Sequence, residues 1–184
     1  MIDKTLSLPP VETLESTNVQ LPYVLVGDSA FALSKNLMRP YPGTYKKGNI
    51  KGIFNYRLSR ARRIVENVFG VMSVVFRIFR SPIELKCDNA ELVTTTCIYL
   101  HNFLSRNKRS RALYTPPGSY DREDSEFNVI NGSWRNEVTE NNLHPLEDEN
   151  ENMDLSLEPS IIRDNFSNYF ISEQGRVSWQ NERA

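Results

Sequence analysis

The stretch that decides the fold is FNYRLSRARRIVENVFG, residues 54–70. Apolar residues recur in it, and just beyond it, at steps of three and four, the spacing of one face of an α-helix: Phe54, Leu58, Ala61, Val65, Val68 and Met72. At 100° per residue, Glu66 falls in a second row along the edge of this face, whereas Arg63 and Asn67 point mostly outward. The pattern predicts a long helix with one buried side and with Glu66 at the margin of that side.

Upstream of this helix, the short apolar run Tyr23–Val26 ends at Gly27 and Asp28. Such a run is typical of a strand that is buried on both faces. Asp28 lies just past the carboxyl end of this strand, where ligands usually bind in open α/β sheets. Residues 29–38 are predicted to form a short helix, which the RPYPG sequence at 39–43 ends. Capping of that helix is an alternative role for Asp28.

Downstream, a second helix is predicted from Asp88, whose spacing to Glu91 resembles a capping box, to about Asn107. Its apolar side is predicted to be Leu92, Val93, Thr96, Cys97, Leu100, Phe103 and Leu104. Residues 115–159 are rich in proline, asparagine and acids, and we expect them to be partly disordered. A short last helix over residues 161–170 carries apolar side chains that are predicted to dock on the body.

The net charge of −1 hides an uneven distribution. Residues 35–111 hold sixteen Lys or Arg against four acids, and residues 121–158 hold twelve acids against two bases. Cations and aromatic residues alternate through residues 46–80, a composition suited to contacts with DNA phosphates. The alternative is that the aromatic residues belong to the core and the cations only solvate their helix.

Two groups of residues are candidates for chemistry. The carboxylates of Asp28 and Glu66 suit Mg²⁺ or Mn²⁺, and two such ions cleave phosphodiesters. The alternative for Glu66 is an ion pair within its own helix, with Arg62 four residues before it or Arg63 three residues before it.

Zinc would need four ligands, and the candidates are Cys87, Cys97, His101 and His144. Cys97 and His101 share a helix face, but the two cysteines lack the short spacing of a zinc site and His144 lies in the acidic segment. A core cysteine and a buried or surface histidine are therefore the favoured interpretation of that pair.

The remaining composition points to a soluble intracellular protein. Only two cysteines are present, which is too few for a disulfide framework. No apolar run approaches the ~18 residues of a membrane span, and the first ten residues do not read as a signal peptide. We therefore expect no membrane partner.

Several ordered motifs between about Pro22 and Gln180 resemble PIF/Harbinger-type DDE transposases and the nucleases derived from them. They are VGDSAF at 26–31, LMRPYPG at 37–43, the stretch at 54–70, FRIF at 76–79, LHNF at 100–103, GSWR at 132–135, YF at 169–170 and WQ at 179–180. The resemblance implies an RNase H-like fold, a DDE triad, two divalent metal ions (Mg²⁺ or Mn²⁺) and a DNA substrate. By the same resemblance, Asp28 is the second triad acid and Glu66 is the third.

The resemblance also implies a nuclear location, with the cytoplasm as an addition, and a Myb/SANT-like partner protein. The first triad aspartate has no counterpart, because only Asp3 precedes Asp28 and its surroundings differ from the family's first block. We therefore expect a fragment, a wrongly delimited gene or a decayed transposon copy that is inactive alone. The alternative is a non-catalytic remnant that binds DNA or protein through its basic body.

The predicted fold is thus α/β: an incomplete RNase H-like domain, with a partial sheet and flanking helices, and a poorly ordered acidic C-terminal region. The predicted organisation has four parts. Residues 1–21 form an N-terminal loop and residues 22–106 the partial DDE endonuclease domain. Residues 107–160 form a loose acidic segment, and residues 161–184 a helix and tail.

Overall fold

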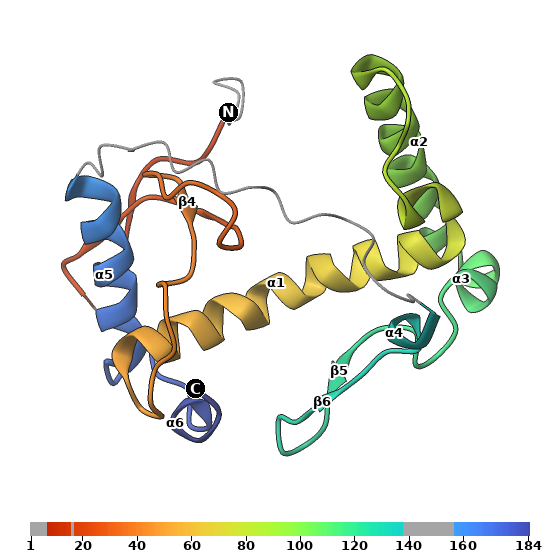
Figure 1. Cartoon of the computed structure of the whole chain (residues 1–184). Coiled ribbons are helices and arrows are strands. Elements are labelled where there is room, and N and C mark those ends of the chain that lie inside the picture. Colours follow the sequence, from red (N-terminus) through yellow and green to blue (C-terminus); the bar gives the residue numbers. More distant parts are fainter. Residues whose placement is uncertain (1–6, 16, 138–156) are drawn as a thin grey trace. The chain divides into compact units, whose positions relative to one another are not determined.

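The computed structural model describes residues 7–15, 17–137 and 157–184, and these form a mixed α/β structure with small two-stranded sheets (Figure 1). The α/β class predicted from the sequence is confirmed, whereas the RNase H-like topology stays a prediction. The chain divides into two compact units, residues 1–62 with 147–184 (unit 1) and residues 63–146 (unit 2). The boundary falls inside helix α1, Ile50–Val75.

Unit 1 begins with two small sheets. Strand β1 (Glu12–Thr13) pairs antiparallel with β2 (Gln20–Leu21). Strand β3 (Leu25–Val26) pairs parallel with β4 (Leu37–Met38), with Leu25 opposite Leu37 and Val26 opposite Met38.

The strand predicted at residues 23–26 is therefore present over its last two residues. Its predicted burial on both faces is wrong, because Leu25 and Val26 are 40% and 41% exposed. The predicted helix over residues 29–38 is also wrong. The chain turns after Asp28 and returns as β4, and Arg39 fixes the turn by donating hydrogen bonds to the carbonyls of Ser29 and Phe31 (both 3.2 Å).

Helix α1 contains the predicted helix and extends it at both ends. Its start is fixed by Asn49, whose side chain accepts a hydrogen bond from the amide of Lys51 (2.9 Å). The predicted buried stripe holds at Phe54, Leu58 and Met72 but fails at its centre, where Ala61 and Val65 are exposed.

The second half of α1 buries a different side from the first half. Asn67, which was predicted to point outward, is 8% exposed, and Gly70 and Val71 are buried beside it. The buried side changes because the first half packs on apolar residues of unit 1, whereas the second half packs on a polar segment of unit 2.

The core of unit 1 joins the start of the chain to its end. Its buried members are Leu21, Leu33, Met38, Tyr41, Phe54, Leu58 and Ile162. Ile162, with partly buried Phe166 and Phe170, comes from α5 (Leu157–Ile171), so the predicted docking of the last helix is confirmed. The short helix α6 (Gln180–Arg183) follows.

Unit 2 continues from α1 into a 3-10 helix, η1 (Arg77–Arg80), and helices α2 (Cys87–Arg106) and α3 (Lys108–Tyr114). The predicted bounds of α2 are confirmed to within one residue. The capping box is wrong, because the N-cap is Lys86 and Asp88 lies inside the first turn. The predicted apolar side is mostly exposed, since the buried residues of α2 are Cys97 and His101.

The acidic segment was predicted to be loose, yet its described part is regular. Strand β5 (Arg122–Glu123) pairs antiparallel with β6 (Val129–Ile130), and helix α4 (Trp134–Glu137) follows. Regular structure therefore reaches Glu137 in this segment, and its predicted partial disorder stays a prediction. The rest of it, residues 138–156, lies outside the described residues, and the four predicted domain bounds stay predictions.

Candidate functional site

Asp28 lies directly after β3, as its place in the sequence predicted. One carboxylate oxygen accepts a hydrogen bond from the amide of Ala30 (3.0 Å), so Asp28 caps a turn where a helix was expected. The other oxygen lies 3.6 Å from Nη2 of Arg62, with side chains 45% and 25% exposed, respectively. Gly27 lies close to its neighbours here, because a Cβ atom would approach the ring of Phe31 to 3.1 Å. The carboxylate is thus held at the strand end, partly open to solvent.

Glu66 lies on α1 in unit 2 and is partly buried. The arginines before it make contacts of their own: Arg62 with Asp28, and Arg63 with Glu123 (2.7 Å). Its charge is also felt by Arg135, as described below. Glu66 therefore lies among charged side chains at the margin of a buried helix side, where the sequence placed it.

A buried polar network lies beside Glu66, and sequence reasoning missed it. The carboxylate of Asp121, fully buried, accepts hydrogen bonds from the amide of Gly132 (2.8 Å) and from Nε and Nη2 of Arg135 (2.9 and 2.6 Å). Asn67 accepts from the amide of Asp121 (2.8 Å) and from Nε1 of Trp134 (2.9 Å). The GSWR motif at residues 132–135 was a sequence signal for this network. The family resemblance marked these residues, but it did not say which residues they contact.

The hydrogen bonds of this network shift the pKa values of its two charged members, Asp121 and Arg135. Burial alone raises the pKa of Asp121, but the hydrogen bonds from Arg135 and Gly132 and the charges of Arg135 and Arg63 outweigh it, so the pKa lies below its ordinary value. The hydrogen bonds to Asp121 raise the pKa of Arg135, burial partly opposes them, and the charges of Asp121 and Glu66 add to the increase. Asp121 is therefore a carboxylate near neutral pH, with its oxygens already engaged.

Asp28 belongs to unit 1 and Glu66 to unit 2, so each carboxylate is described by itself and their joint metal site stays a prediction. Both carboxylates offer the hard oxygen ligands that Mg²⁺ and Mn²⁺ prefer. Within residues 7–15, 17–137 and 157–184, however, no group of three or more His, Cys, Asp or Glu side chains could hold a metal ion.

The basic stretch of residues 46–80 is partly used for packing. Arg57 donates hydrogen bonds to the carbonyl of Gly175 (3.1 Å) and to Gln180 (3.2 Å), and its guanidinium lies 4.6 Å from the centre of the Phe170 ring. Burial lowers the pKa of Arg57, and the charge of Arg60 adds to the decrease.

Other arginines of this stretch also contact aromatic rings or backbone carbonyls of the same chain. Arg60 stacks over the Trp179 ring at 4.9 Å, and Arg80 donates to the carbonyls of Ser73 and Val74. The more exposed cations of the stretch include Lys46, Lys47 and Arg77. A DNA contact through residues 46–80 would therefore depend on only part of the charge that the sequence shows.

Cys97 and His101 are both buried in α2, 8% and 7% exposed. Nδ1 of His101 lies 2.8 Å from the hydroxyl of Tyr114, and burial lowers the pKa of the imidazole. Burial likewise raises the pKa of Tyr114 to about 12. The favoured interpretation, a core cysteine beside a hydrogen-bonded histidine, is confirmed.

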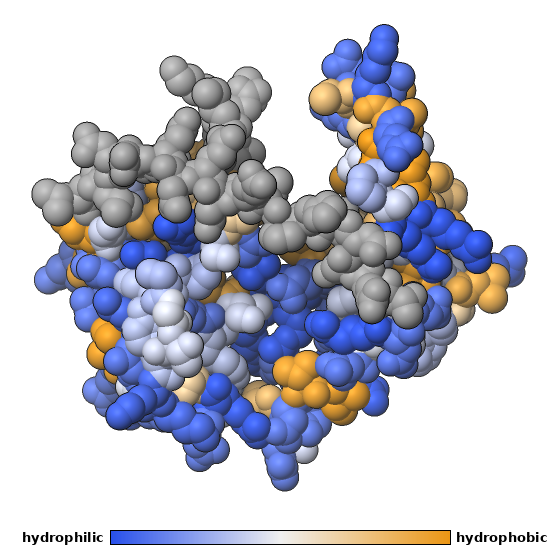
Figure 2. Space-filling model, viewed as in Figure 1, coloured by the Kyte–Doolittle hydropathy of each residue, from blue (hydrophilic) through white to orange (hydrophobic). Residues whose placement is uncertain are grey.

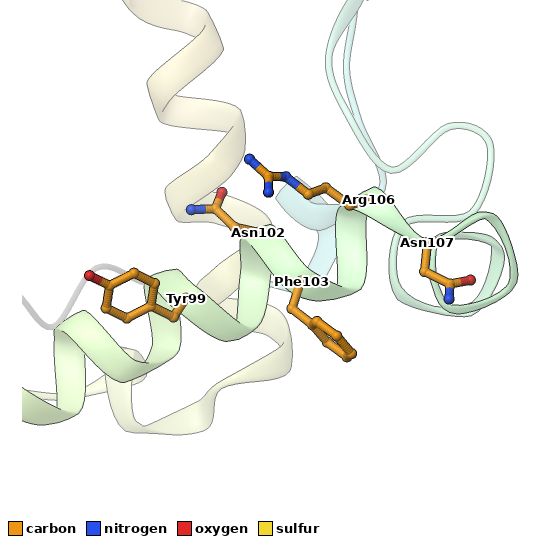
Figure 3. Close-up of a pocket in the computed structure, with 5 residues that line it drawn as sticks. All are labelled: Tyr99, Asn102, Phe103, Arg106 and Asn107. Carbon is orange, nitrogen blue, oxygen red and sulfur yellow. The ribbon is translucent and has the colours of Figure 1, made fainter.

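Helix α2 exposes large apolar side chains, visible as orange atoms in Figure 2. Leu92, Tyr99 and Phe103 are 66%, 71% and 68% exposed. Tyr99, Asn102, Phe103, Arg106 and Asn107 line a pocket at the end of this helix (Figure 3). Apolar exposure of this kind marks a surface suited to contact with another molecule. Of the helices in the described residues, none combines the length and apolar character needed to cross a membrane.

Comparison with known proteins places these observations in a family. The model of the DDE superfamily endonuclease family matches residues 9–102, just over half of the chain, and the match includes both Asp28 and Glu66. Comparisons with curated proteins and with solved structures gave no match. The PIF/Harbinger subtype stays a prediction, whereas a transposase-derived DDE nuclease domain is supported by the match. The chain belongs to the DDE superfamily endonuclease family.

Proposed function

We propose that this chain is the C-terminal part of a PIF/Harbinger-like, transposase-derived nuclease that acts on DNA in the nucleus. Asp28 and Glu66 are the second and third acids of its catalytic triad in this proposal. The observation that carries it is the family match, which runs through both acids. The position of Asp28 directly after strand β3 supports it further, because ligands of α/β sheets gather at that end of a strand.

The family's reaction is phosphodiester hydrolysis or strand transfer, for which divalent metal ions activate the attacking oxygen and stabilise the leaving oxygen. Asp28 and Glu66 are the residues that would supply anionic oxygens to such an ion. Arg62, paired with Asp28, limits the negative charge that this carboxylate offers.

We further propose that the 184-residue chain does not cleave DNA by itself. Two acids hold a divalent ion less tightly than three, because Mg²⁺ gives up its water only to strongly anionic sites. The test incubates supercoiled plasmid and Mn²⁺ with the purified chain and with the Asp28→Ala/Glu66→Ala variant. We expect the two to nick the plasmid equally little. Nicking by the native chain that the variant loses would overturn the proposed inactivity.

The site assignment is tested separately from activity. Mn²⁺ titrated into ¹³C-labelled chain should broaden the carboxyl signals of Asp28 and Glu66 at millimolar concentration, because paramagnetic relaxation acts only at short range. Asp88, on helix α2, is the internal control. Broadening of Asp88 before Asp28 and Glu66 would contradict the assignment.

The alternative function is a non-catalytic remnant that binds DNA or protein. The exposed cations and the exposed apolar side of α2 favour it. A Myb/SANT-like partner protein, which the family resemblance implies, is proposed for the nuclease and for the remnant alike. DNA binding that is unchanged by Asp28→Ala/Glu66→Ala, but weakened by Lys46→Gln/Lys47→Gln, would support it. Each lost phosphate contact should reduce the slope of log affinity against log salt by about one. Affinity that depends on Mg²⁺ and on both acids would instead favour the nuclease.

A further inference from the structure

The segment from Gly118 to Glu137 holds the second half of α1 through Asn67. The Asn67 side chain accepts two hydrogen bonds, from the Asp121 amide and Nε1 of Trp134, and donates one to the Asp121 carbonyl (3.2 Å). Asn67 is 8% exposed, so these groups satisfy a polar side chain that water does not reach freely. Asn67 directly follows Glu66, and its fixed side chain therefore restrains the rotation of the helix at Glu66.

Close packing reinforces these hydrogen bonds one turn further along. The Trp134 ring lies over Gly70, so close that a Cβ atom on Gly70 would come within 2.3 Å of it. Gly132 is equally constrained, because a Cβ there would lie 2.3 Å from the carbonyl oxygen of Ser119. The indole thus occupies a space that only glycine leaves open on α1.

The charged part of the segment is fixed in the same way. Arg135 is bound through two of its nitrogens to the buried carboxylate of Asp121, and its guanidinium lies 4.3 Å from the centre of the Trp134 ring. Two nitrogens bonded to one carboxylate give a planar geometry that a lysine cannot reproduce. Arg135 is therefore held in a defined place between the Asp121 carboxylate and the Trp134 ring.

We propose that Trp134, Arg135 and Asp121 are positioning residues for Glu66: together they fix the rotation of α1 at Asn67 and Gly70. The proposal rests on the proposed function in so far as Glu66 is the third triad acid. A supporting shell of this kind matters because a misplacement of ~1 Å costs on the order of 10²-fold in rate.

The test observes Glu66 directly and needs no catalysis. The side-chain carboxyl ¹³C signal of Glu66, assigned through Glu66→Gln, is compared between the native chain and the variants Trp134→Ala and Arg135→Gln. We expect its chemical shift to change in both, with exchange broadening in Trp134→Ala because the helix is no longer held at Gly70. Arg122→Gln, which removes an exposed arginine of the same hairpin, is the matched control and should leave the signal unchanged.

A second measurement connects the segment to metal binding. Mn²⁺-induced broadening of the Glu66 signal should need about tenfold more Mn²⁺ in Trp134→Ala, since loss of a supporting residue typically costs 10–100-fold in metal affinity. If Trp134→Ala fails to fold, Trp134→Phe and Arg135→Lys carry the test. The first keeps a ring but loses the bond to Asn67, and the second keeps the charge but loses the bidentate bond to Asp121.

The outcomes separate the two proposals. If the Glu66 chemical shift is unchanged in Arg135→Gln, Trp134→Ala and Trp134→Phe, the positioning role is overturned. This holds whatever the Mn²⁺ titration shows. A signal that moves in these variants, but that Mn²⁺ never broadens even in the native chain, would support the positioning contact and contradict the assignment of Glu66 as a metal ligand. Movement together with weakened Mn²⁺ broadening supports both.

Discussion

The two halves of helix α1 are buried in opposite ways. The first half lies in unit 1 and packs Phe54 and Leu58 into a cluster of apolar residues. The second half lies in unit 2, and there the buried side includes Asn67, whose amide group binds the backbone and side chain of the 118–137 segment. One continuous helix thus packs into an apolar cluster at one end, whereas at the other end a polar network is buried together with Val71 and Met72.

This difference affects how each half should respond to change. Apolar packing is roughly proportional to buried area, so its loss is graded and depends on the volume removed. A polar network fails more abruptly, because each group that loses its partner stays buried and unsatisfied. The predictions below test these two behaviours in turn.

The largest effect is expected in the apolar half. Phe54 is 2% exposed and packs edge-on against Tyr41 (5.2 Å between ring centres) and stacked on Phe170 (6.0 Å). Phe54→Ala should lower the free energy of unfolding of unit 1 by about 3–5 kcal/mol. Phe69→Ala lies on the same helix but in unit 2, at a 60% exposed position. It should change the free energy of unfolding of unit 1 by less than about 0.5 kcal/mol.

Fluorine NMR of 5-fluorotryptophan can read the two units separately, since unit 1 holds Trp179 and unit 2 holds Trp134. Denaturant titration of Phe54→Ala should move the Trp179 transition to lower denaturant. Equal losses for Phe54→Ala and Phe69→Ala would show that the aromatic cluster does not hold unit 1 together.

A smaller effect, with a change of sign, is expected in the polar half. Gly70→Ala should destabilise unit 2 by about 1–3 kcal/mol, because the new methyl group collides with the Trp134 ring. In a Trp134→Ala background the same substitution should be neutral or should stabilise by up to ~1 kcal/mol, the ordinary helix preference of alanine over glycine.

Denaturation followed by circular dichroism of the four chains of this cycle measures the coupling between Gly70 and Trp134. Additive effects would contradict the close packing of the two residues. The cycle is informative only if the Trp134→Ala chain folds, which its amide dispersion checks before the comparison.

The apolar half of α1 was the more predictable one. The spacing of Phe54 and Leu58 fixes a helix face, and the hydrophobic effect fixes which way that face points. The position of Asp28 after a strand followed from the same kind of local pattern. The docking of α5 was also predicted, because apolar side chains such as Ile162 and Phe166 leave water only by packing on the rest of the chain.

The polar half was not predictable, because its hydrogen bonds join residues that lie far apart in the sequence. Asn67 and Asp121 are 54 residues apart, and nothing in the local sequence marks either as buried. The acidic composition around Asp121 predicts a loose segment, yet Arg135, fourteen residues later, and the amide of Gly132 together satisfy the buried carboxylate. The family motif GSWR pointed to these residues without giving the contact.

The smallest expected effect is an acid sensitivity of unit 2. Asp121 has a pKa below its ordinary value of 3.8, chiefly because the hydrogen bonds and charge of Arg135 overcome the opposing effect of burial. A carboxyl group with a lowered pKa in the folded state stabilises the fold fully above its unfolded pKa. That contribution is lost as the pH falls from about 4 through the folded pKa.

The native chain should therefore show a Trp134 transition that moves to lower denaturant below about pH 4. Asp121→Asn, which keeps the shape of the side chain but cannot ionise, should start from lower stability and lack this contribution to the pH dependence. Equal pH slopes of the Trp134 transition in the native chain and in Asp121→Asn would show that the Asp121 carboxylate is not what holds the polar half of α1.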